Sequence, residues 1–108
     1  MPRVMTHGIP LERVQRMSGP LADELAALLG VPREHVIIEA SGARFVQDGV
    51  VTDGDPFVEV AMFERDERLE DAVARLVTRC VQAAGCPHVD LYLRHLVRRR
   101  FYEDGEPL

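Results

Sequence analysis

The chain has 108 residues, 46% of them hydrophobic and 29% charged, which predicts one globular domain spanning residues 1–108. Its formal net charge of -5 argues against nucleic acid or an anionic membrane as partner, so a small molecule or a protein is expected. All 13 basic residues are arginine, which excludes a lysine base and a lysine Schiff base.

The first half of the chain predicts a strand, a helix and a second strand. Residues 2–6 (PRVMT) alternate like a short strand. Residues 11–30 carry apolar side chains at helical spacing, namely Val14, Met17, Leu21, Leu25 and Leu28. The Gly-Pro pair at 19–20 interrupts this segment, so we expect a kink there or a restart capped by Ser18. Residues 35–40 (HVIIEA) predict the second strand.

The second half predicts the same order of elements after a hairpin. Residues 43–54 (ARFVQDGVVTDG) predict that hairpin, with turns at the two Asp-Gly pairs. Residues 56–63 (PFVEVAMF) predict a strand, residues 66–85 a helix with one apolar stripe, and residues 89–96 (VDLYLRHL) a further strand. Residues 99–108 (RRFYEDGEPL) predict a short terminal strand or tail.

The two halves share small landmarks. Pro2-Arg3-Val4 opens the first as Pro56-Phe57-Val58 opens the second, and a Gly-X-Pro sequence follows each helix. These matches favour duplicated units, about residues 2–40 and 56–97, although chance is the alternative. Two such units would form an α/β (α+β) fold, with one mixed sheet and both helices on one face.

That layout leaves one sheet face without helices. If Val58, Val60 and Met62 face the helices, the other face carries a mixed set: Phe57, Glu59, Ala61 and Phe63. A face of this character suits burial in a symmetric oligomer. A two-layer domain with one solvated face is the alternative.

Neither a membrane segment nor a metal site is predicted. The sequence has no charged-then-apolar leader and no run of about 18 apolar residues, so we expect a cytoplasmic protein with no membrane partner. Cys80 and Cys86 are the only cysteines and are expected to be reduced. They and the four histidines lack the spacing of metal ligands, and we predict no metal and no cofactor.

The start MPRVMT, the repeated unit and the segment DGDPFVEVAMFER resemble the tautomerase superfamily, the group of 4-oxalocrotonate tautomerase and macrophage migration inhibitory factor. Over nearly its whole length the chain is similar to a small bacterial branch of that superfamily whose members are largely uncharacterised. The resemblance implies a homotrimer whose sheet faces pack together and whose pockets lie at subunit boundaries. It also implies a keto–enol tautomerase that acts on a small enolisable carbonyl acid.

Pro2 is the candidate catalytic residue that the resemblance implies. A small residue behind the initiator methionine permits removal of Met1, which would expose the prolyl amine. Burial and nearby arginines would lower the pKa of that amine towards neutral pH, where it can act as a base. The alternative is that Pro2 only begins the first strand.

Three further residues are candidates for substrate binding. Relatives hold the substrate carboxylate with arginine, and Arg13 and Arg44 are candidates by region. Glu59 lies in an apolar strand, where it is either a paired interface residue or a pocket acid beside Pro2.

The run Arg98-Arg99-Arg100-Phe101-Tyr102 is either a solvated terminal strand or, in a trimer, a source of an arginine for a neighbour's pocket. A rival reading of the whole chain is a non-catalytic oligomeric module, tautomerase-like or ferredoxin-like, that binds a ligand or a protein.

Overall fold

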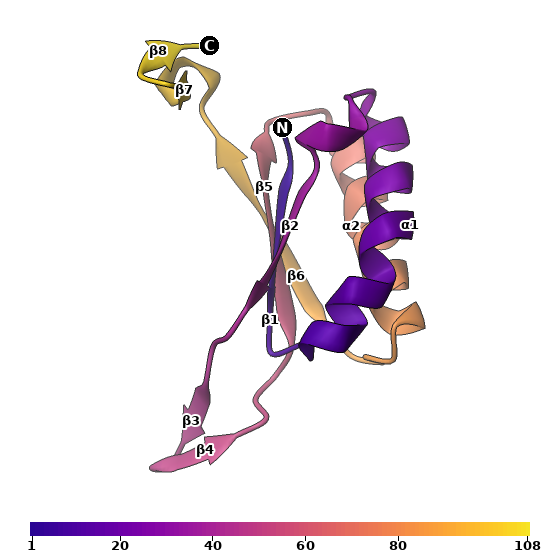
Figure 1. The fold of residues 1–108 in the computed structure, drawn as a ribbon, viewed down its shortest axis with the longest axis vertical. Coiled ribbons are helices and arrows are strands. Elements are labelled where there is room, and N and C mark those ends of the chain that lie inside the picture. Colours follow the sequence, from indigo (N-terminus) through magenta and orange to yellow (C-terminus); the bar gives the residue numbers. More distant parts are fainter.

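Strand β1 (Arg3–His7) lies at the centre of a four-stranded sheet in a computed structural model that describes residues 1–108 (Figure 1). It pairs in parallel with β2 (Ile37–Ser41) and antiparallel with β5 (Phe57–Phe63). Strand β5 pairs in parallel with β6 (Asp90–Leu96). The sheet therefore consists of two parallel strand pairs joined antiparallel, which confirms the predicted α+β fold with a mixed sheet.

Helices α1 (Leu11–Leu29) and α2 (Glu67–Ala83) cover one face of this sheet (Figure 1). The core forms between the layers from fully buried aliphatic side chains: Val4, Leu21, Leu25, Val58, Val60, Val73, Val77 and Val81. Burying each such side chain stabilises the fold by about 1.5–3 kcal/mol, so this layer contact is the main source of stability. Val58, Val60 and Met62 belong to this core, as predicted.

Helix α1 continues through Pro20, so the expected restart at Ser18 is wrong. The helix begins after Pro10, and the Ser18 hydroxyl donates to the Gln15 carbonyl at 2.7 Å instead of capping a new helix. Pro20 is exposed and removes one backbone hydrogen bond. Burial of the inward side of α1 outweighs that cost, because seven of its residues are buried: Val14, Met17, Leu21, Ala22, Leu25, Ala26 and Leu29.

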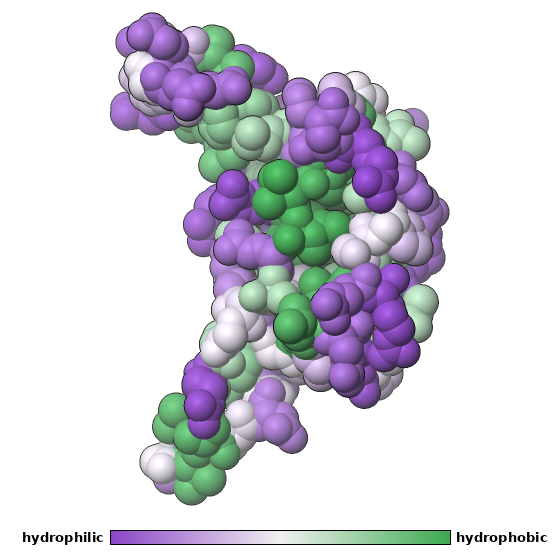
Figure 2. All heavy atoms as spheres, in the orientation of Figure 1, coloured by the Kyte–Doolittle hydropathy of each residue, from purple (hydrophilic) through white to green (hydrophobic).

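Strands β3 (Phe45–Gln47) and β4 (Val50–Thr52) form a hairpin that projects from the body of the molecule, which confirms the predicted hairpin (Figure 1). The second predicted turn, at Asp53-Gly54, is wrong, because residues 53–56 form an irregular segment between β4 and β5. The turn of the hairpin has positive φ at both central residues, 50° at Asp48 and 77° at Gly49, as a type I′ turn requires. Figure 2 shows a hydrophobic patch at the end of this arm. The patch includes the exposed side chains of Val46, Val50 and Val51.

The chain ends in a second projection at the other end of the molecule (Figure 1). A short 3-10 helix, η2 (Arg98–Arg100), follows β6 and leads into a hairpin of β7 (Tyr102–Glu103) and β8 (Glu106–Pro107). Another 3-10 helix, η1 (Arg33–His35), precedes β2. Neither α-helix is long and apolar enough to cross a membrane.

Candidate active site at the N-terminus

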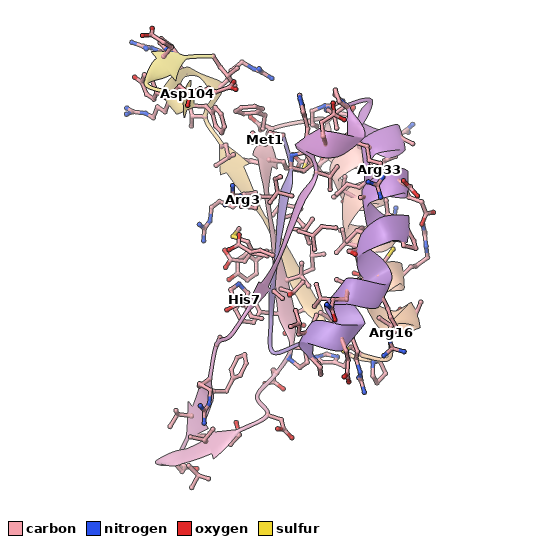
Figure 3. The ribbon with its side chains drawn as sticks, in the orientation of Figure 1. Met1, Arg3, His7, Arg16, Arg33 and Asp104 are labelled. Atoms are coloured by element: carbon pink, nitrogen blue, oxygen red, sulfur yellow. The ribbon has the colours of Figure 1, made fainter.

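A hollow of about 350 Å³ lies at the start of β1 and includes Met1 and Pro2. Most of its lining is apolar and comes from several elements: Leu29, Val31, Ile37, Met62, Phe63, Phe101 and Leu108. Its polar lining consists of the guanidinium groups of Arg65 and Arg98, the carboxylates of Glu34 and Glu103, and the imidazole of His35. Figure 3 shows Met1 at this end of β1 and His7 towards the other end. The hollow thus combines an apolar body with two cations and two carboxylates near the amino terminus.

Pro2 is fully buried at the edge of this hollow. Its carbonyl accepts a hydrogen bond from the Ile37 amide at 3.1 Å, so the pairing of β1 with β2 extends to Pro2. Proline fits this position because a residue that begins a strand loses no ladder hydrogen bond. The sheet therefore fixes where the second residue of the chain lies.

The Met1 amino group has its pKa lowered from the ordinary value by partial burial and by the positive charges of Arg98 and Arg65. Both effects destabilise the ammonium form. A terminal amine at this end of β1 is therefore biased towards its neutral, proton-accepting form.

Arg98 stacks on an aromatic side chain of the hollow. Its guanidinium carbon lies 4.3 Å from the centroid of the Phe63 ring, and the Phe101 ring meets Phe63 edge-on at 5.6 Å. This cation–π contact holds the guanidinium over the ring without engaging its N–H groups in an ion pair, so they are available to a carboxylate. Arg98 makes no ion pair within the chain.

Arg65 is held by its backbone and by its side chain. The Nη2 group donates to the Leu29 carbonyl at 3.3 Å, and the backbone amide donates to Glu70 Oε2 at 3.0 Å. The same Glu70 oxygen lies 2.7 Å from His95 Nε2. Glu70 thus links the segment that carries Arg65 to β6, which leads to Arg98.

Arg13 and Arg44 do not lie at this hollow within one chain. Both line a separate hollow of about 800 Å³ near the other end of β1, where the chain turns into α1. The Arg13 Nη1 group donates to the Gly85 carbonyl at 2.8 Å and lies 3.7 Å from Cys86 Sγ. Arg13 therefore ties α1 to the loop after α2. The structure brings these two candidates to one hollow but places both away from Pro2.

Glu59 lies on the sheet face that carries no helix and does not line the hollow at Pro2. Glu59 is 8% exposed. Its carboxylate accepts a hydrogen bond from Arg94 Nη2 at 2.5 Å and lies 3.1 Å from His7 Nε2. The Phe57 ring stacks against the rings of His7 and Tyr92, with centroid separations of 4.3 Å and 5.8 Å. Glu59 is paired, as one of the two predictions required, whereas its place in an interface stays a prediction.

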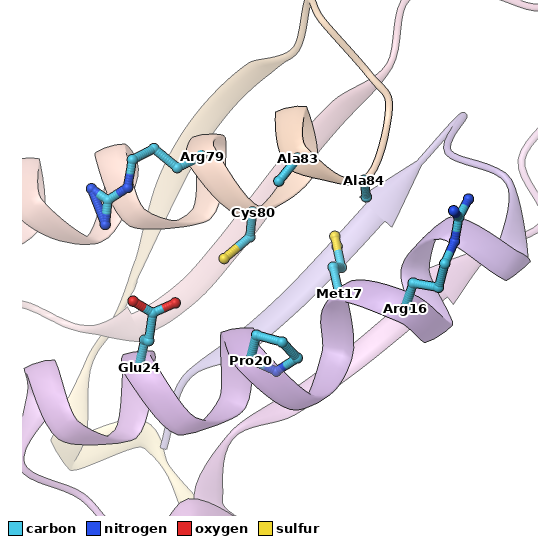
Figure 4. A pocket seen from close by; sticks show the side chains of 8 residues that line it. All are labelled: Arg16, Met17, Pro20, Glu24, Arg79, Cys80, Ala83 and Ala84. Atoms are coloured by element: carbon cyan, nitrogen blue, oxygen red, sulfur yellow. The ribbon is translucent and has the colours of Figure 1, made fainter.

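A third hollow, of about 320 Å³, lies between the two helices (Figure 4). Its lining includes Met17, Pro20 and Cys80, with Glu24 and Arg79 beside the thiol. Burial and the charge of Glu24 raise the pKa of the Cys80 thiol, which disfavours the nucleophilic thiolate. We therefore assign no chemistry to this groove. No group of three His, Cys, Asp or Glu side chains is placed to hold a metal ion.

Sequence reasoning missed Arg65, although one signal pointed to it. Arg65 lies just beyond β5, and β5 pairs antiparallel with β1 so that Ala61 is opposite Arg3. The end of β5 and the start of β1 must therefore lie at the same edge of the sheet. Antiparallel pairing between the first strands of the two repeated units would have predicted that Arg65 lies near Pro2.

A family model described as a domain of unknown function, DUF1904, matches residues 1–107. The chain belongs to the DUF1904 family. Among solved structures, the DUF1904 domain from Sebaldella termitidis ATCC 33386 is 31% identical with a TM-score of 0.88, and the match covers 97% of each chain. No curated protein matches the chain.

This DUF1904 domain also has the fold of the tautomerase superfamily. The macrophage migration inhibitory factor-like protein from Entamoeba histolytica matches with a TM-score of 0.70 at 10% identity, over 99% of this chain and 98% of that one. A fused 4-OT protein, described as an asymmetric trimer, matches with a TM-score of 0.77 at 16% identity, over 97% and 94% of the two chains. The predicted resemblance is thereby confirmed for the fold.

Proposed function

We propose that this DUF1904 protein is a keto–enol tautomerase that acts on a small enolisable carbonyl acid, with Pro2 as general base and acid after removal of Met1. One observation carries the proposal. The first residues of the chain line a largely apolar hollow together with the guanidinium groups of Arg65 and Arg98 and the carboxylates of Glu34 and Glu103.

The hollow would keep a larger fraction of a prolyl amine neutral at pH 7, the form that can accept a proton. An exposed terminal amine has a pKa of about 8, and burial and neighbouring cations lower it. The neutral amine would take a proton from the carbon beside the substrate carbonyl and return it at the other end of the enolate. Because the proline ring restricts rotation, the nitrogen lone pair points in one direction.

The two arginines would bind the substrate and stabilise its charge. Arg98, which lies over the Phe63 ring, would bind the carboxylate through its N–H groups. Arg65, held by Leu29 and Glu70, would stabilise the charge that develops on the enolate oxygen.

We further propose that the protein is a homotrimer that buries the helix-free sheet face. That face carries an aromatic stack and the charge-paired Glu59, a combination suited to burial against other subunits. In such an assembly, Arg13 and Arg44 could contribute to substrate binding only by reaching the Pro2 hollow of a neighbouring subunit.

Intact mass and a ketonisation assay test the proposal. Purified protein should lack Met1 and should convert phenylenolpyruvate to phenylpyruvate. Pro2→Ala, which keeps a terminal amine but loses the ring, should lower kcat/KM by about 100-fold or more. Arg99→Gln is the matched surface control and should not change the rate. Retained Met1, or equal rates for the wild type and Pro2→Ala, would contradict the proposal.

One feature favours the alternative, a non-catalytic oligomeric module that binds a ligand or a protein. The arm formed by β3 and β4 exposes Val46, Val50 and Val51, and three aliphatic side chains on one projection suit contact with another chain. This alternative predicts association with another chain and no ketonisation of phenylenolpyruvate.

A further inference from the structure

Charges of both signs line the hollow at Pro2 without pairing with one another. The cations are Arg65 and Arg98, the carboxylates are Glu34 and Glu103, and the His35 ring completes the polar lining. None of these side chains forms an ion pair within the chain, although all of them border one hollow of about 350 Å³. Unpaired charges of opposite sign around one hollow suit a ligand that carries both signs.

The order of the strands places these charges on different sides of the first residues. The sheet runs β2, β1, β5, β6. At the edge where β1 begins, η1 with Glu34 leads into β2, whereas Arg65 follows the end of β5 and Arg98 follows the end of β6. Glu34 therefore lies on the β2 side of Pro2, and both arginines lie on the side of β5 and β6 (Figure 1). Glu103 reaches the hollow from β7 in the terminal hairpin.

We propose that the carbonyl acid bound in this hollow is dipolar, with an ammonium or guanidinium group at the end remote from its carboxylate. The inference rests on the proposed function, because it takes the hollow at Pro2 as the substrate site. It deepens that function by naming the substrate class. A neutral aryl enolpyruvate remains a substrate but binds more weakly, because it leaves Glu34 without a partner.

One orientation of such an acid satisfies the charges on both sides. Its carboxylate binds Arg98, whose guanidinium lies over the Phe63 ring with no ion pair of its own. Its enolisable carbon lies near Pro2, and its cationic group lies on the η1 side near Glu34. The apolar lining, which includes Val31, receives the carbon frame that joins the two charged ends.

The preference for a cationic ligand should be moderate and sensitive to salt. Glu34 is exposed, so water and dissolved ions screen its charge. A direct hydrogen bond from a ligand ammonium group to this carboxylate should still improve affinity about tenfold. Raising the ionic strength should therefore reduce the preference for the cationic ligand over a neutral one of the same shape.

Two matched ligands test the inference without requiring turnover. 4-(Aminomethyl)cinnamate and 4-methylcinnamate share a carboxylate, a planar aryl-alkene frame like that of an aryl enolpyruvate and nearly the same length. Only the first carries an ammonium group. Isothermal titration calorimetry at neutral pH measures the Kd of each compound on the purified protein. We expect the aminomethyl compound to bind about tenfold more tightly.

Variants assign the two ends of the ligand. Glu34→Gln should remove most of the preference, and the double variant Glu34→Gln, Glu103→Gln should remove the rest. Glu106→Gln is the control, because Glu106 lies in the same terminal hairpin as Glu103 and does not line the hollow. Arg98→Gln should weaken both cinnamates by a similar factor, because it binds the carboxylate that they share. Circular dichroism and thermal melting establish that each variant is folded.

The inference is wrong if the wild type binds the two cinnamates equally, or if Glu34→Gln keeps the preference as Glu106→Gln does. It is also wrong if Arg98→Gln weakens neither compound. Ketonisation of phenylenolpyruvate is measured separately. Protein that ketonises this enol but has no preference between the cinnamates would retain the tautomerase and exclude the dipolar ligand. Protein that has the preference but does not ketonise the enol would retain the dipolar ligand and exclude the tautomerase.

Discussion

The guanidinium group of Arg98 lies over the ring of Phe63, with its carbon 4.3 Å from the ring centroid. This contact fixes a cation at the hollow that contains Met1 and Pro2. Because an exposed cation–π contact contributes only about 0.5–1 kcal/mol, its role would be orientation of the guanidinium more than stability of the fold.

Arg98→Gln should raise KM for phenylenolpyruvate about tenfold while kcat changes less, because the variant loses a charge-assisted contact to the carboxylate. Phe63→Leu keeps the apolar volume and should raise KM by a smaller factor. Steady-state kinetics on protein that lacks Met1 measures both effects. An unchanged KM in Arg98→Gln would remove Arg98 from the site.

The pH dependence of kcat/KM should follow the terminal amine. The neutral amine is the active form, so activity should fall as pH decreases through its pKa. Burial and Arg98 lower the pKa of an amine at this position, and the acid limb should therefore lie below the usual value of about 8. Arg98→Gln removes one cause of the lowering and should move that limb to higher pH. A limb that stays in place would contradict this coupling.

Glu70 should position Arg65 through a backbone contact. Glu70→Gln keeps a side-chain oxygen that can accept hydrogen bonds from the Arg65 amide and from His95, whereas Glu70→Ala loses both hydrogen bonds. We expect urea unfolding to show that Glu70→Ala lowers the free energy of unfolding by about 1–3 kcal/mol and that Glu70→Gln lowers it by less. KM should follow the same order, and equal effects of the two variants would indicate that the accepting oxygen is unimportant.

Gly54 should be required for the base of the projecting arm. A Cβ at this position would lie 2.1 Å from Cγ of the Phe45 ring, and φ is 68°. Gly49 has a similar φ, 77°, but a Cβ there meets nothing within 4 Å. Gly49→Ala should lower the free energy of unfolding by about 1–2 kcal/mol through backbone strain alone. Gly54→Ala should lower it further, because the Phe45 ring must also move. Urea unfolding compares the two variants, and equal losses would contradict the steric argument.

The proposed trimer can be tested on the helix-free face. Tyr92 is half exposed there and stacks on Phe57. Tyr92→Asp should produce a monomer in sedimentation velocity, because an unpaired charge would be buried in the interface. Ala27→Asp, on the exposed side of α1, is the control and should leave the trimer intact. A wild-type protein that sediments as a monomer would refute the assembly.

Local sequence patterns alone determined the two strand–helix–strand units and the hairpin between them. The alternation in residues 57–63, the helical spacing in residues 67–83 and the Asp48-Gly49 turn each depend on neighbouring residues, which act without the rest of the chain. They also predicted which side chains of β5 enter the core.

Tertiary structure decided the course of α1 and the composition of the candidate site. Pro20 breaks an isolated helix, but the buried inward side of α1 keeps it continuous. Pro2 and Arg65 line the same hollow only because β1 and β5 run antiparallel, whereas Arg13 follows the other end of β1. Which residues lie close together across a sheet depends on strand register, and the spacing of residues along the sequence does not determine that register.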